Sequence, residues 1–278
     1  MPTTSLVSVP EVAANAALRH PMPAAMYQLL SVNESLPGAM TVLPAIIRRD
    51  ANLVKRLADV SRGDGPWRER TAKRSLEVGL AAVGFRRAHS SALLITTMEA
   101  LPIETEVFDY LDFWRYAIAV ATVTTSLAYA RHVEGREYAY AAGLFHDIGR
   151  LILEEDDPAG LSIVRSVQLR GDIPWREVEQ SAFGYTALDL SVALARAWRL
   201  PEPLIEAISG LAEGSRAGLT GSLREAALAA RTLSFATSTG RRQELSPEAG
   251  ALIERYFAGP DGLRRRVNAL LESATVAS

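Results

Sequence analysis

The chain has 278 residues, of which 30 are basic and 32 are acidic, and its formal net charge is −2. This near-neutral balance gives no sign of nucleic-acid binding, for which a clear basic excess is typical. Cysteine is absent, which excludes disulfides, thiolate metal sites and cysteine nucleophiles. The 48% of hydrophobic and 22% of charged residues are ordinary for a globular protein with one large domain or two modest ones.

The sequence also bears on localisation. No basic residue precedes Arg19, so the N-terminus lacks the charged start of a secretory signal. The most apolar uncharged stretch near the middle, 116–130, contains hydroxyl residues and is shorter than the roughly 20 residues that span a bilayer. We therefore expect a cytoplasmic protein without membrane insertion, in which 116–130 is a buried helix.

Strong helix formers dominate the sequence, and they predict an all-α fold. The first helical pattern, 19–30, starts after Pro23. The best strand candidate, 92–98, lies within a longer helical pattern, so we expect a helix there as well.

Further helix boundaries follow along the N-terminal half. Two prolines within 34–49 predict a helix that is kinked or broken into short pieces. Asp50 is a suitable N-cap for a helix over 50–62. The Gly-Asp-Gly-Pro content of 62–67 predicts a loop, and the apolar spacing of 73–84 predicts another helix.

The C-terminal part begins with a helix over 200–210, which has prolines before it and a glycine after it. Small residues over 212–222 then predict a linker. Amphipathic patterns predict further helices over 223–238, 246–259 and 263–274.

Charge is unevenly distributed. Between residues 48 and 74 nine basic residues face four acidic ones, whereas 88–114 contains acids and no Lys or Arg. Two interpretations stay open: a solvated surface with charges of both signs, or a docking face for an anionic ligand or an acidic partner.

The stretch "GLFHDIGRLIL" (143–153) places His146 next to Asp147 in an apolar run. Such a pair can hold a metal for phosphoester hydrolysis, but three or four protein ligands are usual. The other histidines, His20, His89 and His132, show no metal-ligand spacing, and we expect surface or capping roles for them. The alternative for the pair is a polar contact within the core, which must be hydrogen-bonded.

In its ordered motifs the chain resembles the HDOD family, the HD-related output domains of bacterial signalling. The motifs are "HPMPAAMYQLL" (20–30), "IIRRDANLVKRLADVS" (46–61), "SLEVGLAAVGFRRA" (75–88), "FWRYAIAVATVTTSLA" (113–128), "AYAAGLFHDIGRLIL" (139–153) and "FGYTALDLSVALARAWRLPEPLIEAI" (183–208). The resemblance implies an all-α, multi-helix HD-like domain over 19–212. We expect an N-terminal helical part over 19–105, an HD-like part over 106–212 and a C-terminal helical extension over 213–278.

The resemblance also implies histidines that this chain lacks. The positions concerned are Tyr116, Ala187, Leu211 and Ala212. A neutral phenol is a poor replacement for imidazole, and aliphatic side chains cannot bind a cation. Only His146 and Asp147 remain of the implied ligand set.

We therefore expect no catalytic residues and no cofactor, with His146 and Asp147 as a vestigial metal pair that holds a helix junction. In that junction Gly149 would end one helix and Arg150 would begin the next segment. The main hypothesis is a non-catalytic signalling module with protein partners. Two alternatives stay open: a divalent-metal phosphohydrolase with an unusual ligand set, and a nucleotide-binding sensor whose pocket contains His146, Asp147, Arg150 and Tyr116.

Overall fold

The structure is a computed structural model, and it describes residues 8–60, 76, 80, 84–170, 175–232 and 247–275. The described residues contain helices and no strand, which confirms the predicted all-α fold. They divide into two compact units, 1–21 with 103–263 and 22–102 with 264–278. The predicted loop over 62–67 and most of the predicted helix over 73–84 lie outside the described residues.

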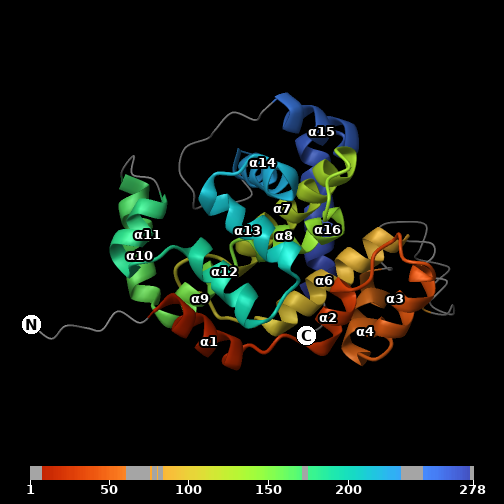
Figure 1. Cartoon of the computed structure of the whole chain (residues 1–278), viewed down its shortest axis with the longest axis horizontal. Coiled ribbons are helices and arrows are strands. Elements are labelled where there is room, and N and C mark those ends of the chain that lie inside the picture. Colours follow the sequence, from red (N-terminus) through yellow and green to blue (C-terminus); the bar gives the residue numbers. More distant parts are fainter. Residues whose placement is uncertain are drawn as a thin grey trace, which may run out of the picture. The chain divides into compact units, whose positions relative to one another are not determined.

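The smaller unit contains four helices among its described residues and the end of α16 (Figure 1). They are α2 (Ala24–Leu30), α3 (Ala39–Ile47), α4 (Ala51–Val60) and α6 (Phe85–Ala100). The helix after Pro23 and the helical nature of 92–98 are thereby confirmed. Pro44 lies inside α3 instead of ending it, while the residues around Pro37 form turns.

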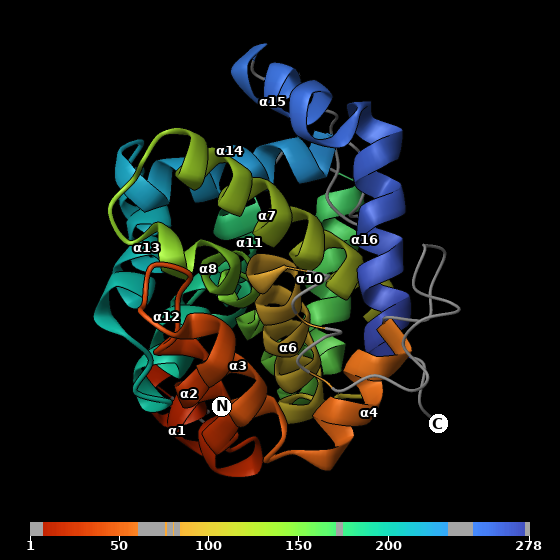
Figure 2. The ribbon, with the colours of Figure 1, turned by 90° about the vertical axis from the view of Figure 1, so that its right-hand side faces the viewer.

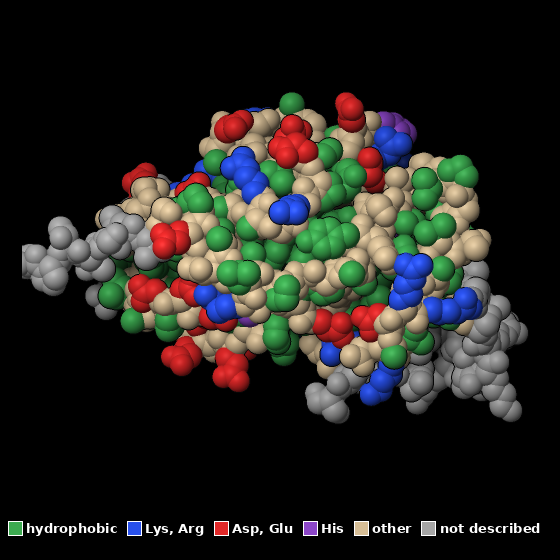
Figure 3. Space-filling model, turned by 60° about the horizontal axis from the view of Figure 1, so that its bottom comes forward, with side chains coloured by type: hydrophobic (Ala, Val, Ile, Leu, Met, Phe, Trp, Pro, Cys, Tyr) green, Lys and Arg blue, Asp and Glu red, His purple; other side chains and the backbone are tan. Residues whose placement is uncertain are grey.

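Local hydrogen bonds explain where α4 begins. The Asp50 carboxylate accepts from the backbone N–H groups of Asn52 (2.9 Å) and Leu53 (3.1 Å), which confirms it as the cap. Arg56 of the basic stretch forms an ion pair with Glu99 of the acidic stretch (3.1 Å). Both signs of charge also occur together on the face drawn in Figure 3, as a solvated surface would have.

The larger unit contains the remaining helices. They are α1 (Val9–Arg19), α7 (Tyr110–Ala130), α8 (Ala139–Phe145), α9 (Gly149–Asp156), α10 (Pro158–Arg170), α11 (Trp175–Phe183), α12 (Ala187–Ala197), α13 (Glu202–Glu213), α14 (Gly218–Thr232), α15 (Pro247–Phe257) and the start of α16 (Gly259–Thr275). A short 3-10 turn (Arg136–Tyr138) precedes α8. The predicted extension 213–278 is thus divided between the two units, with the boundary inside α16.

Helix α7 is the central helix of this unit, and α8 and α14 pack against it (Figure 2). Its middle is fully buried and rich in alanine and valine, so neighbouring helices can approach closely. A Cβ added at Gly143 of α8 would lie 2.2 Å from the Cα of Ala121 on α7. Only glycine fits at this crossing, because real non-bonded carbon contacts are near 3.5–4.0 Å.

Helices α9 and α12 approach each other equally closely. A Cβ on Gly149 would lie 2.1 Å from the carbonyl oxygen of Ala187. The Gly149 N–H donates to the Ser191 hydroxyl (2.8 Å), which in turn donates to the Ala187 carbonyl (2.9 Å). The start of α9 is therefore fixed on the first turn of α12.

The N-terminal helix α1 is joined to α9 through its end. His20 Nε2 lies 2.9 Å from a Glu155 carboxylate oxygen, and Arg19 pairs with Glu155 and Asp156. The Trp198 indole donates to the His20 carbonyl (2.9 Å). His20 is buried at the C-cap position of α1, so of the two expected roles it has the capping one.

No helix among the described residues is both long and apolar enough to cross a membrane.

The close helix crossing predicts the effect of one methyl group. Gly143→Ala should lower the free energy of unfolding by about 1–3 kcal/mol or more, because the new Cβ meets backbone atoms that cannot move aside. Gly250→Ala in α15 is the matched control, since a Cβ there meets nothing within 4 Å. That change should be neutral or stabilise the chain by up to about 1 kcal/mol. Urea unfolding of both variants tests this, and equal stabilities for the two would contradict the close contact.

Candidate functional site

The candidate site is built on the turn between α8 and α9. His146 directly follows α8, and Asp147 and Ile148 lead into α9, which begins at Gly149. The prediction that Gly149 ends a helix is therefore wrong. Gly149 is the first residue of α9, where a glycine is needed because α12 lies too close for a side chain. His146 is buried, with 5% of its surface exposed.

The hydrogen bonds of His146 define its tautomer. Nδ1 lies 2.8 Å from the Gly143 carbonyl, which can only accept, so Nδ1 carries the proton. Nε2 is then an acceptor in the neutral ring, and it lies 3.4 Å from the Tyr116 hydroxyl. Burial lowers the pKa of His146 and outweighs the opposing effect of the Asp147 carboxylate, so the ring is neutral near pH 7.

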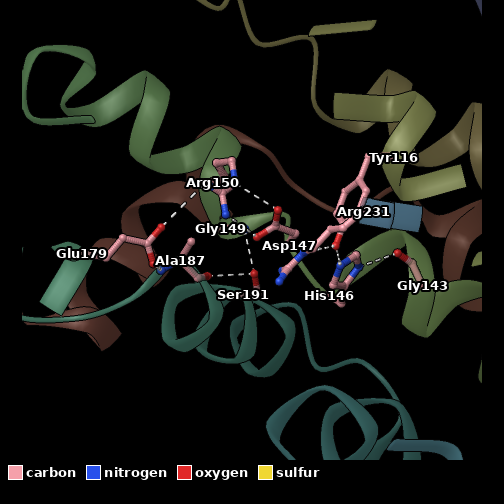
Figure 4. Close-up of polar contacts among 10 residues, drawn as sticks. All are labelled: Tyr116, Gly143, His146, Asp147, Gly149, Arg150, Glu179, Ala187, Ser191 and Arg231. Atoms are coloured by element: carbon pink, nitrogen blue, oxygen red, sulfur yellow. Dashed lines mark hydrogen bonds and ion pairs between the residues drawn. The ribbon is translucent and has the colours of Figure 1, made fainter. Parts of the chain in front are cut away.

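Tyr116 comes from α7 and is 4% exposed. Its hydroxyl accepts from Nε of Arg231 (3.2 Å), on the last turn of α14. Arg231 as a whole is an exposed residue, yet its guanidinium extends inward and lies between Tyr116 and Asp147 in Figure 4. Burial raises the pKa of the Tyr116 phenol more than the charge of Arg231 lowers it.

Both carboxylate oxygens of Asp147 are hydrogen-bonded to Arg150. The guanidinium donates from Nε (3.0 Å) and from a terminal nitrogen (3.2 Å), which is a bidentate pair. Burial would raise the pKa of Asp147, but Arg150 together with His146 and Arg231 lowers it below its ordinary value. Asp147 is therefore ionised and is neutralised by arginine.

Arg150 is itself held on three sides. Besides Asp147, it lies 3.8 Å from Glu179 Oε1, and its guanidinium carbon is 4.0 Å from the centre of the Trp175 ring. Glu179 is 1% exposed, and its second oxygen accepts from the Ala187 N–H (2.9 Å). Burial raises the pKa of Glu179 and outweighs the opposing effects of Arg150 and this N–H.

The structure thus brings all four predicted pocket residues together, from α7, α9 and the turn before it (Figure 4). These residues do not fit a metal ion. The free nitrogen of His146 faces a phenol, and both oxygens of Asp147 are occupied by Arg150. Across the described part of the chain, no three His, Cys, Asp or Glu side chains converge as a metal site would require.

The remaining histidines have surroundings of their own. His89 is buried inside α6 and hydrogen-bonds the Leu29 carbonyl (2.7 Å), so the expected surface or capping role is wrong for His89. His132 is exposed and follows the end of α7, as predicted. Leu211 offers only its carbonyl, which accepts from Arg176 and Arg224.

Sequence reasoning missed two charged members of the site, Glu179 and Arg231. A buried glutamate in the middle of a helix has no local signature, although "WREVEQSAF" does place Val178 and Phe183 on the buried side with it. Arg231 is 115 residues from Tyr116 and lies in the predicted extension. No pattern in the sequence pairs the two positions.

Comparison with known proteins agrees with the fold. The HDOD domain family matches residues 21–212. A solved HDOD domain protein of unknown function from Geobacter sulfurreducens is similar, with a TM-score of 0.67 and 14% identity over 96% of this chain and 98% of that one. No curated protein matches.

Two other solved structures are also similar. One, from Marinobacter aquaeolei and provisionally described as a signal transduction protein, has a TM-score of 0.69 and 22% identity over 91% of this chain and 58% of that one. The other, from Shewanella amazonensis and provisionally described as a phosphohydrolase, has a TM-score of 0.64 and 21% identity over 93% of this chain and 98% of that one. At these identities the likeness concerns the fold.

The lowered pKa of His146 predicts how stability depends on pH. Below the unfolded-state pKa of about 6.5, the unfolded chain binds a proton that the buried ring does not, so stability falls as pH drops from 6.5 to 5. His146→Gln should reduce this slope by up to about 1.4 kcal/mol per pH unit. Asp147 does not contribute in this window, because a lowered carboxyl pKa acts only below about 3.9.

Urea unfolding at several pH values between 5 and 7.5 measures the slope. His89→Gln is the matched variant, because burial lowers the pKa of His89 as well. His146→Gln and His89→Gln should each reduce the dependence of the free energy of unfolding on pH. The double variant should reduce it more than either single change. If the stability of His146→Gln depended on pH as strongly as that of the wild type, the conclusion that His146 is a buried neutral imidazole would be wrong.

Proposed function

Because the chain belongs to the HDOD family, we propose that it is a non-catalytic regulatory module of bacterial signalling, which acts in the cytoplasm through protein partners or a small ligand. One observation carries the proposal: arginine and tyrosine engage the His-Asp pair where a metal would bind. Metal-assisted hydrolysis needs a bound cation that activates water. Here the positive charge comes from Arg150 and Arg231.

The charge balance of the site supports this function. Arg150 neutralises Asp147 and also interacts with Glu179, so the buried carboxylates need no cation from solution. A buried charge without a partner would be costly, whereas here each of the two carboxylates lies within 4 Å of Arg150. Such a network suits a rigid platform better than a reaction centre, because it leaves no open coordination position for substrate or water.

A phosphohydrolase with an unusual ligand set is the less supported function. It would require Arg150 to release Asp147 and Tyr116 to leave Nε2 of His146. Both movements would expose buried polar groups, and the described residues offer no third metal ligand nearby.

Measurements of metal content and of hydrolytic rate distinguish the regulatory module from the phosphohydrolase. We expect metal-treated protein to retain less than one equivalent of transition metal and to hydrolyse neither phosphodiesters nor nucleotides. His146→Ala should lower the free energy of unfolding by about 1–3 kcal/mol through the unsatisfied groups it leaves and should abolish no catalytic rate. His132→Ala, at an exposed position, is the control for stability. A stoichiometric metal, with a hydrolytic rate that His146→Ala removes, would refute the proposal.

A nucleotide sensor is a second candidate, and one observation favours it. Among the described residues Arg231 has one hydrogen-bond partner, the Tyr116 hydroxyl, and no ion pair, so its terminal nitrogens are the candidates to bind an anion. Arg150, the arginine of the expected pocket, interacts with Asp147 and Glu179 instead. A nucleotide would therefore bind through Arg231.

Thermal shift measurements with a panel of nucleotides test this candidate. A specific ligand at 100 times its dissociation constant adds about 2.7 kcal/mol to the free energy of unfolding. Arg231→Met should lose the shift, whereas Arg196→Met, at an exposed position on α12, should keep it. If no nucleotide raises the melting temperature, or if both variants respond equally, the sensor hypothesis fails.

A further inference from the structure

Helix α14 lies beyond residues 21–212, which the HDOD family matches, yet it contributes to the His-Asp site. It lies along α7, the helix that carries Tyr116 (Figure 2). Its packed side is fully buried and made of small or medium residues: Ser222, Leu223, Ala226, Ala229 and Ala230. Such residues allow two helices to pack closely, so α14 has a defined position on α7.

The last turn of α14 places Arg231 at the site. Its Nε is 3.2 Å from the Tyr116 hydroxyl, and that hydroxyl is 3.4 Å from Nε2 of His146. Two successive contacts thus connect α14 to the buried imidazole (Figure 4).

The direction of these hydrogen bonds is determined by their chemistry. Arginine can only donate, so the Tyr116 oxygen accepts from Arg231. Nε2 of His146 can only accept, because Nδ1 carries the ring proton toward Gly143. The Tyr116 O–H therefore donates to His146 while Arg231 is in place.

A simpler role for Arg231 would be to stabilise the helix end, since a cation in the last turn interacts favourably with the helix dipole. Lysine would serve that role equally well. The contact with Tyr116, however, is made by Nε, an atom within the guanidinium that lysine lacks. The geometry therefore points to a specific contact with the site and not to charge alone.

We propose that the Arg231–Tyr116 contact is a latch through which the end of α14 sets the hydrogen bonding of His146. Displacement of α14 by a partner would release the Tyr116 hydroxyl and change the site, and restoring α14 would reset it. The inference rests on the proposed function in one respect, that the site is regulated and not catalytic.

The test uses the full chain without any partner and compares Arg231→Met, Arg231→Lys, Tyr116→Phe and the double variant Arg231→Met/Tyr116→Phe. The control is Glu225→Gln, which removes an ion pair that joins α14 to Arg131, directly after α7 (2.8 Å). Hydrogen exchange over 218–232 reports on α14. Imidazole nitrogen NMR reports on His146, one of only four histidines in the chain.

Arg231→Met should raise exchange in the last turn of α14 on the order of tenfold, as expected for the loss of one charged hydrogen bond, and should shift the Nε2 resonance of His146. Arg231→Lys should behave like Arg231→Met. The double variant should exchange no faster than the faster single variant, because both changes break the same contact. Glu225→Gln should leave the His146 resonance unchanged.

An unchanged His146 resonance in Arg231→Met, full rescue by lysine, or additive effects of the two changes would each overturn the latch. None of these outcomes depends on hydrolysis or metal content. The latch can therefore fail while the proposed function stands, and hydrolysis by the wild-type protein would refute the function without affecting the measured coupling.

Discussion

The ion pair between Asp147 and Arg150 is the constraint on which the site depends. A carboxylate that is largely shielded from water needs a neutralising partner, and the chain supplies a bidentate guanidinium at hydrogen-bond distances of 3.0 and 3.2 Å. Arg150 requires support in turn, which Glu179 and the face of Trp175 supply. The turn between α8 and α9, the position of α11 and the start of α12 are therefore linked by one set of buried charges.

Close backbone packing determines where those charges can lie. Gly143 allows α8 to meet α7, and Gly149 allows α9 to meet α12, each at a distance that a methyl group would prevent. The turn with His146 and Asp147 lies between these two crossings, so little room remains for it to move. The turn is therefore held in place by the close packing at Gly143 and Gly149 as well as by its polar contacts.

Much of the fold could be predicted from the sequence, because helix formers, caps and apolar spacing act locally. Asp50 caps α4 as its residue type suggests, and the ordered motifs identified the family correctly. Pro44 was harder to place, because it is the sixth residue of α3, where proline removes a helical hydrogen bond and is disfavoured, yet the helix continues to Ile47. The burial of His20 and His89 depends on tertiary partners, Glu155 and the Leu29 carbonyl, which no local pattern specifies.

Part of the candidate site could not be predicted from the sequence either, for the same reason. His146, Asp147, Arg150 and Tyr116 could be proposed together because family motifs align them. Glu179 and Arg231 could not, since a charged residue on a helix is ordinarily solvent-exposed, and only the packing of α11 and α14 turns these two inward. The sequence predicts a vestigial pair of His146 and Asp147, and in the structure one phenol and two guanidinium groups surround that pair.

A site whose positive charge comes from an arginine is controlled differently from a site that binds a metal ion. A metal centre responds to the supply of ions in the cell, and a chelator can empty it. The guanidinium of Arg231 is covalently part of the chain, so its local concentration is constant and no competition for ions can deplete it. This cation leaves the site when the Arg231 side chain or the last turn of α14 moves, so the state of the site is linked to the position of a helix.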